Sequence, residues 1–163
     1  MNYKHFNLDG ATLFVKKVGR SIVYLVVYVD DLLITDNNDD YVVFIKKELQ
    51  KVFDMTDWGL LHYCLGIEVD QKPKYIFISQ KKYIGYLLSK FEMLDCNSVS
   101  TPMEKNQKLV SHEGSTFEDP TKYKKLVGSL IYLTTTRPDI SFVVGILSRF
   151  MHQPCEGHWI AAK

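Results

Sequence analysis

Two adjacent carboxylates, Asp30 and Asp31, are the strongest candidate for a chemical site in this sequence of 163 residues. An uninterrupted apolar run over 22–29 precedes them, and residues 32–34 are again apolar. Carboxylate oxygens are the ligands that Mg²⁺ prefers, and two such ions can stabilise the attacking and leaving oxygens of a phosphoryl transfer. The pair therefore predicts a Mg²⁺ site for phosphoryl transfer, with an ordinary turn rich in aspartate as the alternative.

The apolar runs on both sides of the pair have the composition of buried β-strands. They are rich in β-branched and aromatic residues and are short for helices. A carboxylate inside a buried strand is costly unless it is neutralised, so we expect Asp30 and Asp31 at the exposed turn of a β-hairpin. A strand over 11–17 and a turn at Gly19 would extend this hairpin to a three-stranded antiparallel sheet.

Apolar residues at helical spacing predict the helices. Between Val42 and Phe53 they predict a helix of about four turns that covers one face of the sheet, after a loop with N-capping residues at 36–39. A long irregular connection is expected over 95–119, because this segment has no clear periodicity. The other expected helices are one capped by Ser79 that runs through Phe91, one from Asp119 to Arg137, one opened by Asp139, and a short one from Gly157.

A second hairpin is expected between these helices. Its strands are predicted over 63–69 and 75–79, with a turn over 71–74 that contains a proline. The first strand contains Gly66. A glycine inside a strand indicates a bulge or the close approach of another backbone, and ordinary strand packing is the alternative.

The charge of the chain is unevenly distributed along the sequence. Residues 1–71 carry 7 Lys and Arg against 11 Asp and Glu, whereas residues 72–125 carry 10 against 6. The basic half could face a phosphate backbone, or could be an ordinary solvated surface.

Three widely spaced cysteines suit a reducing, intracellular compartment, either cytoplasm or nucleus. The longest apolar run is too short to span a membrane, so we expect no membrane partner.

The string Tyr28-Val29-Asp30-Asp31 resembles the Tyr-x-Asp-Asp catalytic hairpin of reverse transcriptases. The longer string VYVDDLLIT is similar to the copia-type long-terminal-repeat retrotransposon branch. Further strings follow in the order found in copia-type Pol polyproteins, namely LGIEV, ISQKKYI, STPM, LVGSLIYLTTTRPDI, LSRFM and HW-x-AAK. Several ordered motifs at compatible spacing are far more specific than a single Asp-Asp pair.

The resemblance implies an α+β fold with two parts. Residues 1–79 would form part of a polymerase palm, in which an antiparallel sheet has one covering helix and a second hairpin. Residues 80–163 would form a small helical thumb and the start of the connection region. The partners implied are an RNA or DNA primer-template and a deoxynucleoside triphosphate, and the cofactor is a pair of Mg²⁺ ions.

The resemblance also implies a role for each matching residue. Asp30 and Asp31 would be catalytic and would bind the metal, Tyr28 and Val29 would line the nucleotide and primer site, Leu65 and Gly66 would form the primer grip, and Lys81 and Lys82 would contact the nucleic-acid backbone.

Polymerase palms of this kind also use a third carboxylate on an earlier strand, together with fingers. No residue of this chain is assigned as that acid, and nothing places Asp9 on the right strand. We therefore expect a reverse transcriptase fragment that is inactive alone and binds Mg²⁺ weakly or not at all. The alternatives are a non-catalytic nucleic-acid-binding remnant and an open reading frame without a function. An exposed sheet edge is expected to promote self-association.

Overall fold

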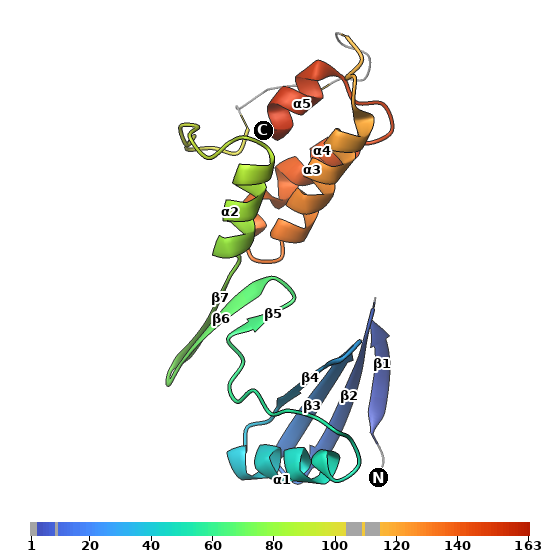
Figure 1. Ribbon diagram of the computed structural model, residues 1–163, viewed down its shortest axis with the longest axis vertical. Coiled ribbons are helices and arrows are strands. Elements are labelled where there is room, and N and C mark those ends of the chain that lie inside the picture. Colours follow the sequence, from blue (N-terminus) through green and yellow to red (C-terminus); the bar gives the residue numbers. More distant parts are fainter. Residues whose placement is uncertain (1–2, 9, 104–108, 110–114) are drawn as a thin grey trace. The chain divides into compact units, whose positions relative to one another are not determined.

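The computed structural model describes residues 3–8, 10–103, 109 and 115–163, and it contains two compact units, 1–59 and 60–163 (Figure 1). The described residues form two antiparallel sheets and five α-helices, which confirms the expectation of mixed α and β structure with antiparallel sheets. The division expected at residue 79 lies within the second unit, which holds the second hairpin together with four of the helices.

The first unit is a four-stranded antiparallel sheet with one helix. Its strands, in spatial order, are β1 (Lys4–Leu8), β2 (Ala11–Val18), β3 (Ser21–Tyr28) and β4 (Asp31–Thr35). The last three strands are the predicted sheet, and β1 is an addition that pairs with β2. All five residues of β1 are exposed, and its five residues are too few for a clear period-2 pattern, so the strand was not predicted.

Helix α1 (Asp39–Gln50) covers one face of this sheet, as predicted (Figure 1). It begins after Asn38, whose side chain accepts the backbone N–H of Tyr41 at 3.3 Å. The covered face includes Val23, which is fully buried, and Lys16, whose Nζ lies 3.4 Å from the Tyr41 hydroxyl. Side chains alternate along a strand, so the residues next to Lys16 in β2 and next to Val23 in β3 project from the opposite face.

The second unit begins with a three-stranded sheet in the order β5 (Tyr63–Cys64), β6 (Ile67–Lys72) and β7 (Tyr75–Ser79). The predicted hairpin of β6 and β7 is present. The continuous strand predicted over 63–69 is wrong, because a two-residue turn separates β5 from β6. The helices that follow are α2 (Lys81–Lys90), α3 (Pro120–Leu133), a 3₁₀ turn η1 (Pro138–Ile140), α4 (Ser141–Ser148) and α5 (Glu156–Ala162).

The helix starts are only partly as expected. Asp119 caps α3 by accepting the Lys122 N–H at 2.9 Å, as predicted. Ser79 does not cap α2, because it is the last residue of β7 and its hydroxyl lies 3.4 Å from Glu68 Oε2. The helix expected to open at Asp139 begins there as the 3₁₀ turn η1, which leads directly into α4, and both Asp139 carboxylate oxygens accept hydrogen bonds from the Arg137 guanidinium. In the irregular connection expected over 95–119, the described residues belong to no helix or strand, as predicted. Residues 104–108 and 110–114 of this connection lie outside the described residues.

The helices of the second unit enclose a hydrophobic core around Tyr123, Val127 and Leu147. Tyr123 is fully buried, and its hydroxyl donates to the Leu147 carbonyl at 2.9 Å, so its one polar atom is satisfied inside the core. His158 is also buried and stacks on Phe150 with ring centroids 3.9 Å apart.

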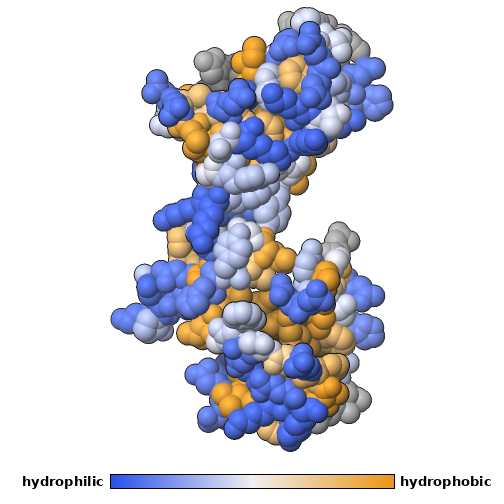
Figure 2. Space-filling view, viewed as in Figure 1, coloured by the Kyte–Doolittle hydropathy of each residue, from blue (hydrophilic) through white to orange (hydrophobic). Residues whose placement is uncertain are grey.

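Hydrophobic side chains also reach the surface of both units (Figure 2). They include Phe6 and Leu8 on β1, and Ile76 and Phe77 on β7, all about half exposed or more. Both strands are at the edge of their sheets. Within the described part of the chain, no helix combines the length and apolarity required to cross a membrane.

Candidate functional site

The two aspartates lie where the sequence predicts them, at the turn between β3 and β4. Tyr28 and Asp31 are the last paired residues of this hairpin, so Val29 and Asp30 alone form its turn. Both Asp30 and Asp31 are exposed. Solvent and cations can therefore reach both carboxylates without any unfolding of the sheet.

The turn has an unusual backbone at Val29. Its φ angle is +49°, and its side chain is 77% exposed. A β-branched residue is rarely found in this left-handed region, and two-residue hairpin turns with positive φ at the first position normally have glycine, asparagine or aspartate there. Strained backbone of this kind is concentrated at functional sites, and Val29 is one such position in this turn.

Tyr28 and Asp31 share the face of the sheet opposite α1. They pair across the hairpin, and Tyr28 is five positions after the helix-facing Val23, so its side chain projects from the opposite face. The ring of Tyr28 lies over Gly10, where an added Cβ would meet Tyr28 Cε2 at 3.3 Å. Since Gly10 also has a φ of +79°, glycine suits both the backbone and the space at this position.

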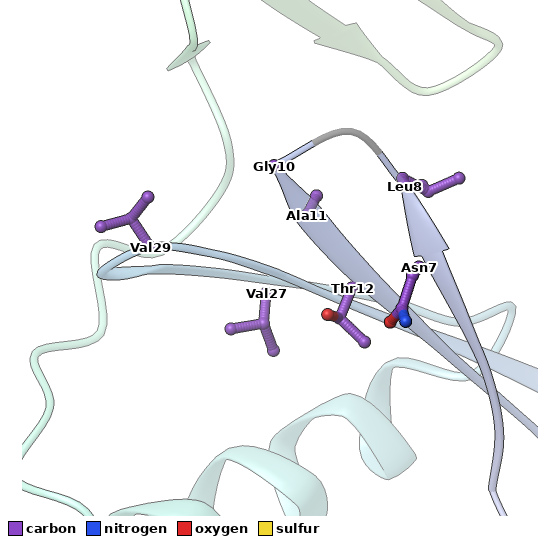
Figure 3. A pocket seen from close by; sticks show the side chains of 7 residues that line it. All are labelled: Asn7, Leu8, Gly10, Ala11, Thr12, Val27 and Val29. Carbon is purple, nitrogen blue, oxygen red and sulfur yellow. The ribbon is translucent and has the colours of Figure 1, made fainter.

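An open cleft of about 300 Å³ adjoins the same end of the sheet (Figure 3). The side chains of Asn7, Thr12 and Val27 point into it from three neighbouring strands, on the side that faces α1. The lining residues are Asn7, Leu8, Gly10, Ala11, Thr12, Val27 and Val29. This cleft could not be predicted from the sequence, because Asn7 and Leu8 belong to β1, a strand that the sequence analysis did not predict.

The donor set at the turn fits a Mg²⁺ ion only in part. Asp30 and Asp31 supply the oxygen ligands that this ion prefers, and both are accessible. In the part of the chain that the structure describes, no group of three or more His, Cys, Asp or Glu side chains converges to hold a metal. Asp9 lies outside the described residues, so the structure does not place it.

Leu65 and Gly66 form the turn between β5 and β6, flanked by the pair Cys64 and Ile67. Their φ angles are +49° and +81°, and positive values at both positions are typical of the tight type I′ hairpin turn. The sequence predicted a strand interior with a bulge or a close approach at Gly66. The close approach exists, but it is made by the ring of Tyr132, whose Oη would lie 3.3 Å from a Cβ at Gly66.

Sequence reasoning missed Tyr132, which also donates a hydrogen bond from its hydroxyl to the Leu65 carbonyl. Tyr132 follows the turn by more than sixty residues, and its position in an apolar helical pattern marks it only as a core residue. Burial raises the pKa of Tyr132 above its ordinary value. The hydroxyl therefore remains a hydrogen-bond donor throughout the physiological pH range.

Lys81 and Lys82 are exposed at the start of α2, as expected for residues that contact solvent or phosphate. The Lys82 ammonium lies 5.4 Å from the centre of the Tyr63 ring, and the Lys82 backbone N–H donates to Glu68 Oε2 at 3.2 Å. A carboxylate thus lies near the helix start. The side chains of both lysines nevertheless remain available to an external anion.

Comparison with known proteins identifies the family. Residues 1–105 match the family described as "Reverse transcriptase (RNA-dependent DNA polymerase)". The chain belongs to this reverse transcriptase family. The exposed Tyr-x-Asp-Asp turn lies within the matched residues, and so does the Leu65–Gly66 turn.

Curated relatives place this reverse transcriptase chain in the copia-type retrotransposon branch. It is 43% identical to the retrovirus-related Pol polyprotein from transposon RE2 of Arabidopsis thaliana and 44% identical to that from transposon RE1, over 96% of the chain in both cases. It spans 11% of the length of each of these polyproteins. An uncharacterized mitochondrial protein of the same plant is 41% identical over 81% of the chain and 55% of that protein. No solved structure matches the chain with significance.

Proposed function

We propose that this chain supplies the acidic hairpin of an RNA-directed DNA polymerase site, with Asp30 and Asp31 as its metal ligands. The observation that carries the proposal is the exposed two-residue turn that presents both aspartates beside a strained Val29. Family membership supports it, because the turn has the Tyr-x-Asp-Asp sequence at the end of two apolar strands.

Mg²⁺ ions held at such a site would supply activation of the primer 3′-hydroxyl and neutralisation of the charge on the triphosphate. Asp30 and Asp31 would hold these ions together with a further acid. Tyr28 and Val29 would line the primer and nucleotide site, since Val29 projects at the turn and Tyr28 shares its face with Asp31. Since the turn is already formed in the free chain, the ligands would need little rearrangement when a cation binds.

In this proposal residues 1–79 belong to a polymerase palm, and residues 80–163 belong to the thumb and the start of the connection region. Leu65 and Gly66 would hold the primer terminus, and Lys81 and Lys82 would contact phosphates of the primer-template. The exposure of these lysines and the tight Leu65–Gly66 turn support these roles. A deoxynucleoside triphosphate would be the second substrate.

We infer that the 163-residue chain is catalytically incomplete by itself, because its described residues bring only two carboxylates together. Primer extension by the purified chain in Mg²⁺ tests this inference. We expect no nucleotide incorporation above that of a chain with both aspartates changed to asparagine. Incorporation that depends on Asp30 and Asp31 would overturn it.

A second candidate function is binding of nucleic acid without chemistry. Helix α2 favours it, since it carries Lys81, Lys82 and Lys90 and no acidic residue. Binding to a primer-template duplex should weaken steeply as salt rises, because lysine–phosphate contacts release counterions. Substitution of the three lysines by glutamine should reduce the slope of the salt dependence, and no binding at low salt would exclude this function.

Self-association through an exposed sheet edge is a further part of the proposal. Among the described residues, strand β7 is paired on one edge only, and Tyr75, Ile76, Phe77 and Ile78 on it are each 47–65% exposed. Unpaired backbone groups next to exposed apolar side chains form a template for pairing with another chain.

A further inference from the structure

The Leu65–Gly66 turn is held from outside its own hairpin. Strand β5 is only two residues long, and a two-stranded hairpin of this size is marginally stable in water. Leu65 also adopts a positive φ, which is unfavourable for a residue with a branched side chain. The turn therefore needs support from other parts of the second unit.

Tyr132, in the last turn of α3, supplies two contacts. Its hydroxyl donates to the Leu65 carbonyl, and its ring lies against Gly66, where the Oη would be 3.3 Å from an added Cβ. The Tyr83 ring of α2 meets the Tyr132 ring edge to face, with centroids 5.2 Å apart. Since rings in this geometry attract each other, Tyr83 restricts the orientation of the tyrosine that reaches the turn.

Gln80, at the junction of β7 and α2, is the next residue of this group. It is 1% exposed, and its Oε1 accepts the Thr136 hydroxyl at 2.7 Å, which fixes the orientation of the amide. Its Nε2 is buried and has no hydrogen-bond partner among the described residues. Thr136, which orients this amide, follows Tyr132 by four residues at the C-terminal end of α3, so the Gln80 amide and Tyr132 lie on the same side of that helix end. A buried amide donor without an acceptor is costly, so a use for it beside Tyr132 is favoured.

We propose that Gln80, Tyr132 and Thr136 form a clamp that positions the Leu65–Gly66 turn on the helices of the second unit. In this clamp Thr136 orients Gln80, the Gln80 amide directs the Tyr132 hydroxyl, and Tyr132 holds the Leu65 carbonyl. The three are positioning residues. The inference rests on the proposed function, in which the turn holds the primer terminus, and it adds that the terminus moves together with α3.

Hydrogen exchange in the full chain tests the clamp directly. The Val69 N–H donates to the His62 carbonyl at 2.8 Å and closes β5 onto β6, so its exchange rate reports opening of this hairpin. In Tyr132→Phe we expect Val69 to exchange roughly 5-fold faster, the change that corresponds to the loss of one hydrogen bond. The Val127 amide, in the core part of α3, is the internal control and should not change.

Tyr86→Phe is the matched variant, because Tyr86 is an exposed tyrosine that also stacks on Tyr83, with centroids 6.3 Å apart. We expect no change at Val69 in this variant. Gln80→Glu keeps the acceptor for Thr136 but removes the amide donor, so it should also accelerate exchange at Val69. Unchanged exchange at Val69 in Tyr132→Phe, or equal acceleration at Val69 and Val127, would overturn the clamp.

Binding of nucleic acid separates the clamp from the proposed function. The probe is a primer-template duplex with a recessed 3′ end, compared with a blunt duplex of equal length. We expect Tyr132→Phe to lose the preference for the recessed end while binding to the blunt duplex is unchanged. A wild-type chain without that preference would contradict the proposed function, whereas the exchange at Val69 would still decide the clamp. A preference retained in Tyr132→Phe would contradict the positioning role.

Discussion

Tyr28 and Asp31 are directly opposite each other as the last residue pair of the β3–β4 hairpin, on the face of the sheet that α1 leaves uncovered. The two residues between them, Val29 and Asp30, are therefore the whole turn. This relationship places an aromatic side chain and a carboxylate on one surface. In the proposed function, a base or sugar would lie on this surface next to a cation held by the aspartates.

Metal binding should be weak and confined to this turn. Mn²⁺ binds the same oxygen ligands as Mg²⁺ and broadens nearby amide resonances in NMR spectra. Titration of the chain with Mn²⁺ should therefore first broaden the amide resonances of residues 28–31. Changing Asp30 and Asp31 to asparagine should remove the effect. The matched control changes Asp39 and Asp40, a second adjacent and exposed pair at the start of α1. Equal broadening at both pairs would contradict a specific site.

Val29 should tolerate glycine unusually well. Glycine relieves the positive φ, which costs roughly 1–2 kcal/mol, and this gain offsets the backbone entropy that glycine loses on folding. We expect Val29→Gly to change the free energy of unfolding by less than about 0.5 kcal/mol in urea denaturation. Val43→Gly, at a half-exposed position inside α1, should lose about 1 kcal/mol or more. Equal losses in the two variants would mean that Val29 is not strained.

Tyr123 should make the second unit sensitive to alkaline pH. Burial raises the pKa of Tyr123 to about 12, so the folded state favours the neutral phenol. The stabilisation is fully present below the ordinary tyrosine pKa of about 10 and is lost as the pH rises toward 12. Tyr123→Phe should lose about 1 kcal/mol at neutral pH with the bond to Leu147, and should show a smaller decline between pH 10 and 12 in thermal denaturation. An identical alkaline decline in wild type and variant would contradict this account.

The β7 edge should cause self-association that depends on concentration. We expect size-exclusion chromatography to show wild-type species larger than a monomer, and Phe77→Lys to shift the chain toward monomer, because lysine on an edge strand opposes pairing. Trp58→Lys is the control, since Trp58 is 91% exposed and lies outside the strands. A wild-type chain that remains monomeric at every concentration would contradict the proposal.

Local signals in the sequence were sufficient for the acidic hairpin and for most helices. The apolar runs around Asp30 and Asp31 predict the strands, the cost of burying carboxylates predicts the turn, and Asp119 followed by Pro120 predicts the start of α3. Each of these features depends on residues that are close in the chain. The family resemblance extended the prediction to the roles of the residues.

Features that depend on distant contacts could not be predicted in this way. Gly66 was assigned to a strand because the apolar pattern continues through it, whereas the turn there is supported by Tyr132 of α3. Similarly, β1 is exposed along its whole length, so the pairing with β2 rather than burial defines it as a strand. Ser79 was a plausible cap by residue type, but the strand pairing of β7 includes it.

The most direct measurement of the central claim is primer extension by a chimera. In it, this chain replaces the matching segment of the Pol polyprotein from transposon RE1, after the unaltered polyprotein has been shown to extend a primer. We predict Mg²⁺-dependent extension that falls roughly 10³-fold when either Asp30 or Asp31 becomes asparagine and is unchanged when Asp39 and Asp40 do. An active chimera that retains its rate after both Asp30 and Asp31 are replaced would contradict the assignment of this hairpin as the metal-binding centre.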